Sequence, residues 1–219
     1  MQVKIDDLTF IVSNKNEHQQ RHWISGKFYE KKMLDFIKRN HKSGVFVDVG
    51  SCIGNHTMYF STIAKEVYSF EPDVDNFTQQ SNIVKLNNTL NVKMFNIAIG
   101  DANKLNRFKK APASNIGQGT ITEQGTELVP TFRLDEFNLT DVTLIKIDVE
   151  GHEEQVLKGA TNTIKTNTPD LFIECSDKED KGTRLSILKS IDSRYEMYKK
   201  QFNATPTYLF TIKDFKEFK

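Results

Sequence analysis

The sequence is poor in the features that mark a membrane protein or a protein of an oxidising compartment. Its 219 residues contain no run of eighteen apolar residues, and the first twenty are charged and polar, so we expect neither a membrane-spanning helix nor a signal peptide. Only two cysteines occur, Cys52 and Cys175; they lie far apart and lack the partners of a metal site. These absences predict a reduced, cytoplasmic protein.

A strong charge of one sign is also absent. The 30 lysines and arginines nearly balance 29 aspartates and glutamates, which leaves a net charge of +1. Lys109-Lys110 and the lysine-rich tail are the only hints of a nucleic-acid partner, and a solvated surface explains them better. The sequence therefore argues against a nucleic-acid or membrane partner. The length suits one α/β domain, and nothing in the composition assigns an oligomeric state.

The most informative stretch is residues 45–72. It begins with VFVDV, an apolar, β-branched run typical of a strand buried on both faces. A tight turn with glycines at Gly50 and Gly54 follows, then a helix, then a second strand that ends in Glu71, roughly twenty residues beyond Gly50. Nucleotide-binding α/β units have this order. With Asp48 the loop reads DxGxxxG rather than GxGxxG, which is the arrangement of S-adenosylmethionine-dependent methyltransferases.

The chemistry of S-adenosylmethionine accounts for these residue types. A glycine at Gly50 lets the backbone approach the methionine part of the cofactor, where a Cβ would collide. Glu71 can accept two ribose hydroxyls, and Asp48 can hold the ammonium group, directly or through water. The alternative is a plain β-turn-α unit whose glycines serve only the turn. The remaining positions expected to contact the cofactor are Ser51, Cys52, Gly54, His56, Thr57 and Pro72.

The third strand is expected within residues 91–99, and the loop after it should reach the adenine. Either Asp101 or the backbone near Ala98 would accept the exocyclic amine, unless Asp101 only caps its own turn. Residues 102–130 do not fit a simple crossover. We predict a long loop there that is functional or forms a substrate-facing lid.

A second informative stretch is residues 142–153, VTLIKIDVEGHE. It predicts a buried strand, a turn and a helix that starts near His152. Asp148 and Glu150 are two residues apart and share a face of an extended chain, and Glu174 lies at the end of the next strand. Ligands of open α/β sheets bind at the carboxyl ends of the strands, where strand order reverses. These four side chains are therefore candidates for a general base that takes the acceptor's proton.

Each candidate base has an alternative role. Asp148 can instead hold the methionine end of the cofactor, Glu150 can satisfy backbone donors around Gly151, and His152 can be an exposed residue at the helix start. Some O-methyltransferases use Mg²⁺ held by carboxylates. Asp148 and Glu174 are compatible with a divalent metal, but no complete ligand set is visible and no metal is predicted.

Residues 1–42 are expected to precede the main unit as a hairpin, a polar loop at 13–21 and a helix from Tyr29 to His41. This helix can cover the cofactor as a lid. The alternative is that Trp23, Phe28 and Tyr29 only pack against the edge of the sheet. Residues 43–219 are expected to form the methyltransferase domain, with the whole chain as one compact unit.

The sequence resembles the FkbM family of methyltransferases over about residues 45–175. One departure is Cys52, because the family commonly has asparagine there, in a D-x-G-A-N-x-G pattern; this puts any side-chain contact to the cofactor in doubt. The motifs that carry the resemblance are VDVGSCIGNHT, FEP, NIAIGD, LDEF, LIKIDVEGHE and VLKGA, with the strand at 169–174.

The resemblance implies a single Rossmann-like α/β methyltransferase domain with a mostly parallel seven-stranded sheet, an antiparallel closing strand and helices on both faces. It also implies S-adenosylmethionine as donor and O-methylation of a sugar, glycan or small-metabolite hydroxyl. Two alternatives stay open: an RNA or DNA methyltransferase on the same fold, and a non-catalytic cofactor-binding module.

Overall fold

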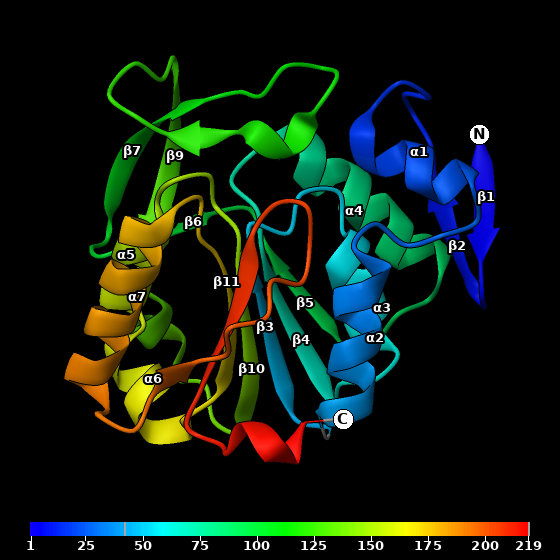
Figure 1. Ribbon diagram of the computed structural model, residues 1–219. Coiled ribbons are helices and arrows are strands. Elements are labelled where there is room, and N and C mark those ends of the chain that lie inside the picture. The colour runs from blue at the N-terminus through cyan, green and yellow to red at the C-terminus, as the bar shows by residue number, and fades with distance from the viewer. Residues whose placement is uncertain (42, 219) are drawn as a thin grey trace.

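The computed structural model describes residues 1–41 and 43–218. A central seven-stranded sheet runs through the molecule in the order β12-β13-β11-β10-β3-β4-β5 (Figure 1). Its strands are β3 (Val45–Val49), β4 (Glu66–Phe70), β5 (Val92–Phe95), β10 (Val142–Ile147), β11 (Asp170–Glu174), β12 (Glu196–Met197) and β13 (Thr207–Thr211).

The sheet is mixed. The pairs β5–β4, β4–β3, β3–β10 and β10–β11 are parallel, whereas β13 runs antiparallel to both β11 and β12. The predicted α/β fold is confirmed, and the chain reverses its direction of travel across the sheet between β3 and β10. Ligands of open α/β sheets bind outside the carboxyl ends of the strands at such a point.

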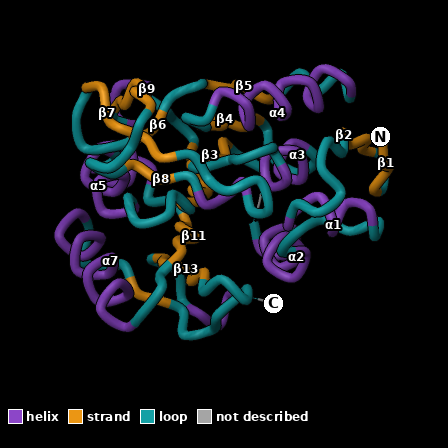
Figure 2. Tube along the Cα trace, turned by 90° about the horizontal axis from the view of Figure 1, so that it is seen from above, coloured by secondary structure: helices purple, strands orange, loops and turns teal. Residues whose placement is uncertain are grey.

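Helices cover both faces of this sheet (Figures 1 and 2). Alternation along β3 explains why: Phe46 faces one apolar cluster, while Val47 and Val49 face the other. No helix within the described part of the chain is long and apolar enough to cross a membrane. One face carries α2 (Lys31–Asn40), α3 (Asn55–Ser61) and α4 (Val74–Leu86), and the other carries α5 (Glu153–Gly159), α6 (Thr161–Asn167) and α7 (Lys178–Ile191).

Residues 102–130, predicted as one long loop, contain strands of a second sheet, so the prediction of a single loop was wrong. Four strands pair in the order β6-β9-β7-β8, and Phe108, Val129 and Ala98 form a small core of their own. The predicted third strand is correspondingly divided into β5 and β6. The strands of the second sheet are β6 (Ala98–Ile99), β7 (Lys104–Lys109), β8 (Thr120–Ile121) and β9 (Glu127–Phe132), with short 3₁₀ turns at η1 (Ile116–Gln118) and η2 (Leu134–Phe137).

The amino-terminal segment forms a hairpin of β1 (Gln2–Ile5) and β2 (Leu8–Ile11), followed by α1 (His18–Ile24). Helix α1 begins inside the segment predicted to be a polar loop, residues 13–21, and extends beyond it, so that prediction was wrong for residues 18–21. Glu17 caps the helix by accepting a hydrogen bond from the backbone N–H of Gln20. Trp23 is fully buried, and its indole N–H donates to Asn55 Oδ1 at 2.9 Å. The aromatic residue of this segment therefore packs against the domain.

Asp170, at the start of β11, joins the carboxyl-terminal segment to α2. Its carboxylate is fully buried, lies 2.8 Å from His41 Nε2, accepts a hydrogen bond from Thr211 and pairs with Lys213. Burial opposes ionisation of Asp170, but the contacts with His41, Lys213 and Thr211 outweigh burial and hold its pKa below the usual value.

We expect Asp170→Asn to lower the free energy of unfolding by about 3 kcal/mol, because it removes the buried carboxylate that pairs with His41 and with Lys213. Urea denaturation at pH 7 measures this. Since the folded-state pKa is depressed, the stabilisation is present above about pH 4 and is lost as the pH falls further. The matched control is Asp141→Asn, a surface pair with Lys65, which should change stability by less than about 0.5 kcal/mol. Equal effects of the two substitutions would contradict this account.

Candidate functional site

The glycine turn after β3 sits directly beside the end of β10. Gly50 has a φ of +79°, and a Cβ on it would lie 1.9 Å from the backbone oxygen of Asp148. Gly54 has a φ of +89°, and a Cβ there would lie 2.7 Å from Gln80 Cγ. The two ends therefore approach each other at a distance that only glycine permits at Gly50.

Gly50→Ala is expected to abolish cofactor binding or stable folding, because its Cβ meets backbone that cannot swing away. The control is Gly26→Ala, whose φ is +73° but whose Cβ would meet nothing within 4 Å. That control should lose only about 1–2 kcal/mol of stability, the cost of the left-handed conformation. Thermal unfolding with and without S-adenosylhomocysteine checks both variants, and comparable behaviour would count against the close approach.

Cys52 also has a left-handed backbone, with a φ of +51°. Its contribution is its backbone N–H, which donates to Glu71 Oε2 at 2.8 Å. Its thiol is buried, and burial raises the pKa of that thiol well above the usual range. Asparagine adopts the left-handed backbone conformation more readily than most residues. This gives a conformational reason for the asparagine that the FkbM motif D-x-G-A-N-x-G has at the position of Cys52. The departure leaves the backbone contact intact.

Glu71 lies at the carboxyl end of β4 with both carboxylate oxygens engaged. Oε2 accepts from Cys52, and Oε1 accepts from the backbone N–H of Asp73 at 2.8 Å. The side chain is almost completely buried, and burial raises the pKa of Glu71 to about 7 although the two hydrogen bonds act against the shift. Each oxygen retains a lone pair for a further donor.

Two pockets meet at the edge of the sheet formed by these strand ends. The first, of about 520 Å³, runs from Glu71 to the second sheet and has a mainly apolar wall. Strands β7 and β8 supply Phe108 and Ile121, so the second sheet closes one side of this pocket. The residues that line it are Val49, Gly50, Cys52, Phe70, Glu71, Pro72, Asn76, Ile97, Ala98, Ile99, Phe108, Ile116, Gly117, Gly119, Ile121, Asp148, Val149 and His152.

The second pocket, of about 530 Å³, is polar and lies between the glycine turn, α1 and the end of β11. Gly50, Cys52, Gly117 and Asp148 line both pockets, so the two are neighbours. The other residues of the second pocket are His18, Gln19, Tyr29, Ser51, His56, Asn115, Lys146, Glu150, Glu174 and Thr205.

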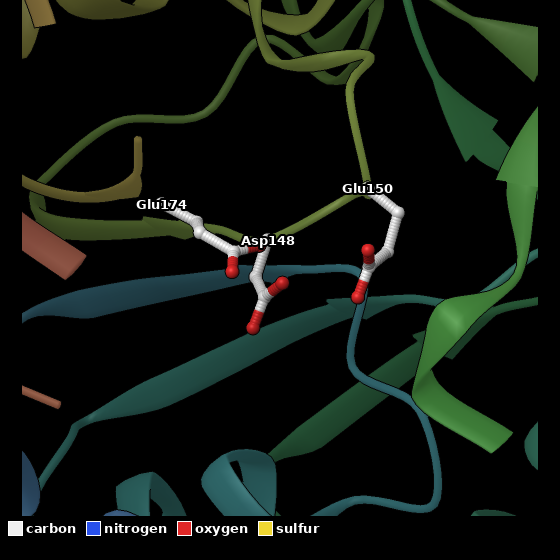
Figure 3. Close-up of side chains that lie close together, drawn as sticks. All are labelled: Asp148, Glu150 and Glu174. Carbon is white, nitrogen blue, oxygen red and sulfur yellow. The ribbon is translucent and has the colours of Figure 1, made fainter. Parts of the chain in front are cut away.

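Three carboxylates gather in the second pocket: Asp148, Glu150 and Glu174 each offer an oxygen within 4.8 Å of the others. Figure 3 shows Asp148 and Glu174 side by side, with Glu150 opposite them. Burial and the charge of Asp148 raise the pKa of Glu174 above its usual value. Partial desolvation, with Asp148 and Glu153 nearby, raises the pKa of Glu150 to about 7.

Lys146 places a buried ammonium group beside Asp148, and the sequence-based candidate set did not include it. It is 2% exposed, and its Nζ lies 3.1 Å from Asp148 Oδ2 and 4.0 Å from Asp48 Oδ1. Burial opposes ionisation of Asp148, but the Lys146 ammonium and a hydrogen bond with Glu174 hold the pKa of Asp148 below its usual value. A lone charge inside the apolar strand TLIKI was the signal that could have identified it.

Several predicted cofactor residues line the pockets. Gly54 does not, and it lies against the Gln80 side chain. Asp48 and Thr57 do not line the pockets either. They lie beneath the glycine turn, where Thr57 Oγ1 donates to Asp48 Oδ2 at 2.6 Å and Gln80 donates to Thr57. Asp101 is exposed, outside both linings, and pairs with Lys104 at 3.3 Å. These side chains support the site from behind or lie away from it.

The two predicted histidines lie in different pockets. His152 lines the first pocket, which Asp148 also lines but Glu150 and Glu174 do not, and burial lowers the pKa of His152. His56 lines the second pocket with its Nε2 2.9 Å from Glu30 Oε2. The structure therefore brings Asp148, Glu150 and Glu174 together as predicted from their strand ends, and places His152 with the apolar wall.

The same three carboxylates have the oxygen ligands that Mg²⁺ prefers. The Lys146 ammonium, however, already neutralises Asp148 from within the sheet. A divalent cation at this position would compete with a buried positive charge, so the donor set fits an acid–base role better than a metal site.

Comparison with known proteins places these features in context. A family model described as "Methyltransferase FkbM domain" matches residues 48–210. The chain is 30% identical over 137 residues to the hexuronic acid methyltransferase AglP of Haloferax volcanii, covering 59% of this chain and 55% of AglP.

Solved structures share the fold. A methyltransferase FkbM from Methylobacillus flagellatus KT superposes with a TM-score of 0.60 at 20% identity, covering 77% of this chain and 43% of that protein. A candidate methyltransferase from Streptococcus mutans in complex with SAH gives 0.52 at 14% identity, covering 82% and 94%. The chain spans about half the length of AglP and of the Methylobacillus protein.

Proposed function

Because the chain belongs to the methyltransferase FkbM family, we propose that it is an S-adenosylmethionine-dependent O-methyltransferase. The proposed acceptor is a hydroxyl of a sugar, a glycan or a small metabolite. A relative whose name states that it methylates a hexuronic acid supports a sugar acceptor. We further propose that residues 1–42 act with the rest of the chain as one unit, because His18, Gln19 and Tyr29 line the second pocket.

The observation that carries the proposal is the position of Asp148, which lines both pockets. A side chain at this junction can touch an acceptor in one pocket while the donor occupies the other. Methyl transfer is an in-line displacement, and bound S-adenosylmethionine supplies an already activated methyl group. The protein's main contribution is therefore alignment of the two reactants.

In the first pocket, Glu71 would accept hydrogen bonds from the ribose hydroxyls, for which both of its oxygens retain lone pairs. The apolar wall from Pro72, Ala98 and Phe108 would enclose the adenine and exclude water. The glycine turn at Gly50 would let the methionine part approach the backbone.

In the second pocket, Asp148 would act as the general base. Lys146 keeps its carboxylate ionised, so it can take the hydroxyl proton as the acceptor oxygen attacks. Glu174 holds a proton beside it, and Glu150 lies at the entrance. His152 lies in the apolar wall of the first pocket, so we assign it to cofactor binding rather than to proton transfer.

Because Lys146 provides the counter-charge of Asp148, the proposed mechanism does not require a divalent metal. Activity should persist unchanged after EDTA treatment and should not rise on addition of Mg²⁺. A loss of activity on chelation that Mg²⁺ restores would contradict this assignment.

The function is tested by incubating the protein with methyl-labelled S-adenosylmethionine and a cell extract, then separating glycan, lipid, protein and nucleic acid. We expect the label in the glycan or small-molecule fraction. Label in nucleic acid would support the RNA or DNA alternative. Tight cofactor binding with no label in any fraction would support a non-catalytic binding module.

A further inference from the structure

The charges of the second pocket discriminate among sugar acceptors. This inference rests on the proposed function, and it concerns what else the acceptor can carry beside the methylated hydroxyl. Proteins recognise carboxylates and phosphates with arginine or lysine. Among the described residues that line this pocket there is no arginine, and the only lysine is Lys146.

Lys146 is already engaged by the protein's own carboxylates. It is 2% exposed and lies between Asp148 and Asp48. Burial would lower its pKa, but the charges of Asp148, Asp48 and Glu30 outweigh burial and raise the pKa above its usual value. Its ammonium is therefore committed inside the sheet and is not available to an anionic ligand.

His56, the more buried histidine of the pocket, also has a carboxylate partner within the protein. His56 Nε2 lies 2.9 Å from Glu30 Oε2, and the two side chains are 5% and 3% exposed. Any positive charge on His56 is thus balanced by a buried carboxylate. His18, nearer the surface, lies with its Nδ1 3.4 Å from the guanidinium of Arg21.

The facing wall is acidic. Asp148, Glu150 and Glu174 offer oxygens within 4.8 Å of one another, and Figure 3 shows the three side chains close together. Burial and the charge of Asp148 raise the pKa of Glu174 and of Glu150, so a further negative charge is unfavourable here. A carboxylate on the acceptor would meet this wall without a cation to pair with.

The remaining groups suit neutral hydroxyls. Gln19, Asn115, Thr205 and Tyr29 can donate and accept hydrogen bonds, as sugar hydroxyls do. They come from α1 and from three separate loops around the pocket, so a polyhydroxylated ring could be held from several sides.

We infer that the acceptor is a sugar that carries no carboxylate or phosphate beside the methylated hydroxyl. The chain would then differ in acceptor charge from AglP, whose name states a hexuronic acid. The acceptor hydroxyl needs the base that Asp148 provides, whereas a carboxylate next to that hydroxyl would be repelled by the Asp148 carboxylate.

The test uses matched pairs of p-nitrophenyl hexosides and hexuronides that differ only at C6. Each is incubated at pH 8 with methyl-labelled S-adenosylmethionine, and the products are separated by anion exchange. In the pair that is methylated, we expect kcat/KM to be at least about tenfold higher for the hexoside than for the hexuronide, because like-charge contacts strongly disfavour binding. Glu150→Gln should narrow this difference, whereas Glu179→Gln, on the exposed start of α7, should leave it unchanged.

The outcomes separate the inference from the function it rests on. Equal or faster methylation of the hexuronides would overturn the inference and leave the sugar methyltransferase intact. A difference that Glu150→Gln leaves unchanged would overturn its electrostatic basis. Label in neither series would overturn the sugar acceptor and the inference together.

Discussion

Asp148→Asn is expected to lower kcat by about 10²–10⁴-fold, the usual contribution of a general base. The asparagine amide has nearly the same shape but cannot take a proton from the acceptor hydroxyl. Binding of S-adenosylhomocysteine should change much less, because the first pocket is formed mainly by Glu71 and apolar side chains. Steady-state methyl transfer and calorimetry on the same preparation measure the two effects.

The matched control is Asp101→Asn. Asp101 is an exposed carboxylate paired with Lys104, outside both pockets, so the same chemical change should leave kcat near the wild-type value. Near wild-type turnover in Asp148→Asn would remove Asp148 from the chemistry. A comparable loss in the control would show that the change in net charge, not the position, matters.

The second large effect is expected for Glu71→Gln. This substitution should weaken the binding of S-adenosylhomocysteine by roughly 10–100-fold, because charge-assisted hydrogen bonds are lost. Both Glu71 oxygens already accept backbone N–H groups. In glutamine one of these oxygens becomes an NH₂ that faces a donor and cannot accept a ribose hydroxyl. Calorimetry at pH 8 measures the change; Glu66→Gln, at the opposite end of β4, is the control and should bind normally.

The pH dependence gives this prediction a second readout. Burial raises the pKa of Glu71 to about 7, so wild-type affinity should fall as the pH decreases through 7 and a proton removes acceptor capacity. The stability of the unliganded protein should change in the opposite direction. A raised carboxyl pKa means that ionisation of Glu71 opposes folding above pH 7 and that protonation relieves this. A pH-independent affinity, or an affinity in Glu71→Gln that keeps the wild-type pH profile, would contradict the assignment.

The strand ends that form the site could be predicted because they depend on local sequence. The apolar runs before Gly50 and Asp148 mark buried strands, and parallel strands bring their carboxyl ends to one edge. That rule predicted that Asp148, Glu150 and Glu174 lie close together, and the structure places their carboxylate oxygens within 4.8 Å of one another. The spacing from Gly50 to Glu71 predicted an acid for the ribose hydroxyls, and the structure places Glu71 Oε2 2.8 Å from the backbone nitrogen of Cys52 in the turn.

The second sheet could not be predicted in this way. Strands β7 and β9 pair antiparallel at the register Leu105–Pro130, about 25 residues apart in sequence, so no short-range pattern specifies them. Pro130 within β9 would also argue against a strand. The contribution of Phe108 to the first pocket depends on this long-range pairing.

Side-chain partners were the other feature that sequence patterns do not specify. Thr57 and Asp48 were expected to contact the cofactor, but the Thr57 hydroxyl donates a hydrogen bond to Asp48 beneath the glycine turn. His152 follows Asp148 by four residues, yet the left-handed backbone at Glu150 and Gly151 turns the chain, so that it faces the first pocket instead. Such directions depend on backbone conformation at single residues.

The most direct measurement is a crystal structure with S-adenosylhomocysteine bound. The account predicts ribose hydroxyls on Glu71, adenine between Ala98 and Phe108, and the sulfur atom at the junction beside Asp148. A nucleoside bound elsewhere, with Glu71 unliganded and the junction empty, would contradict it.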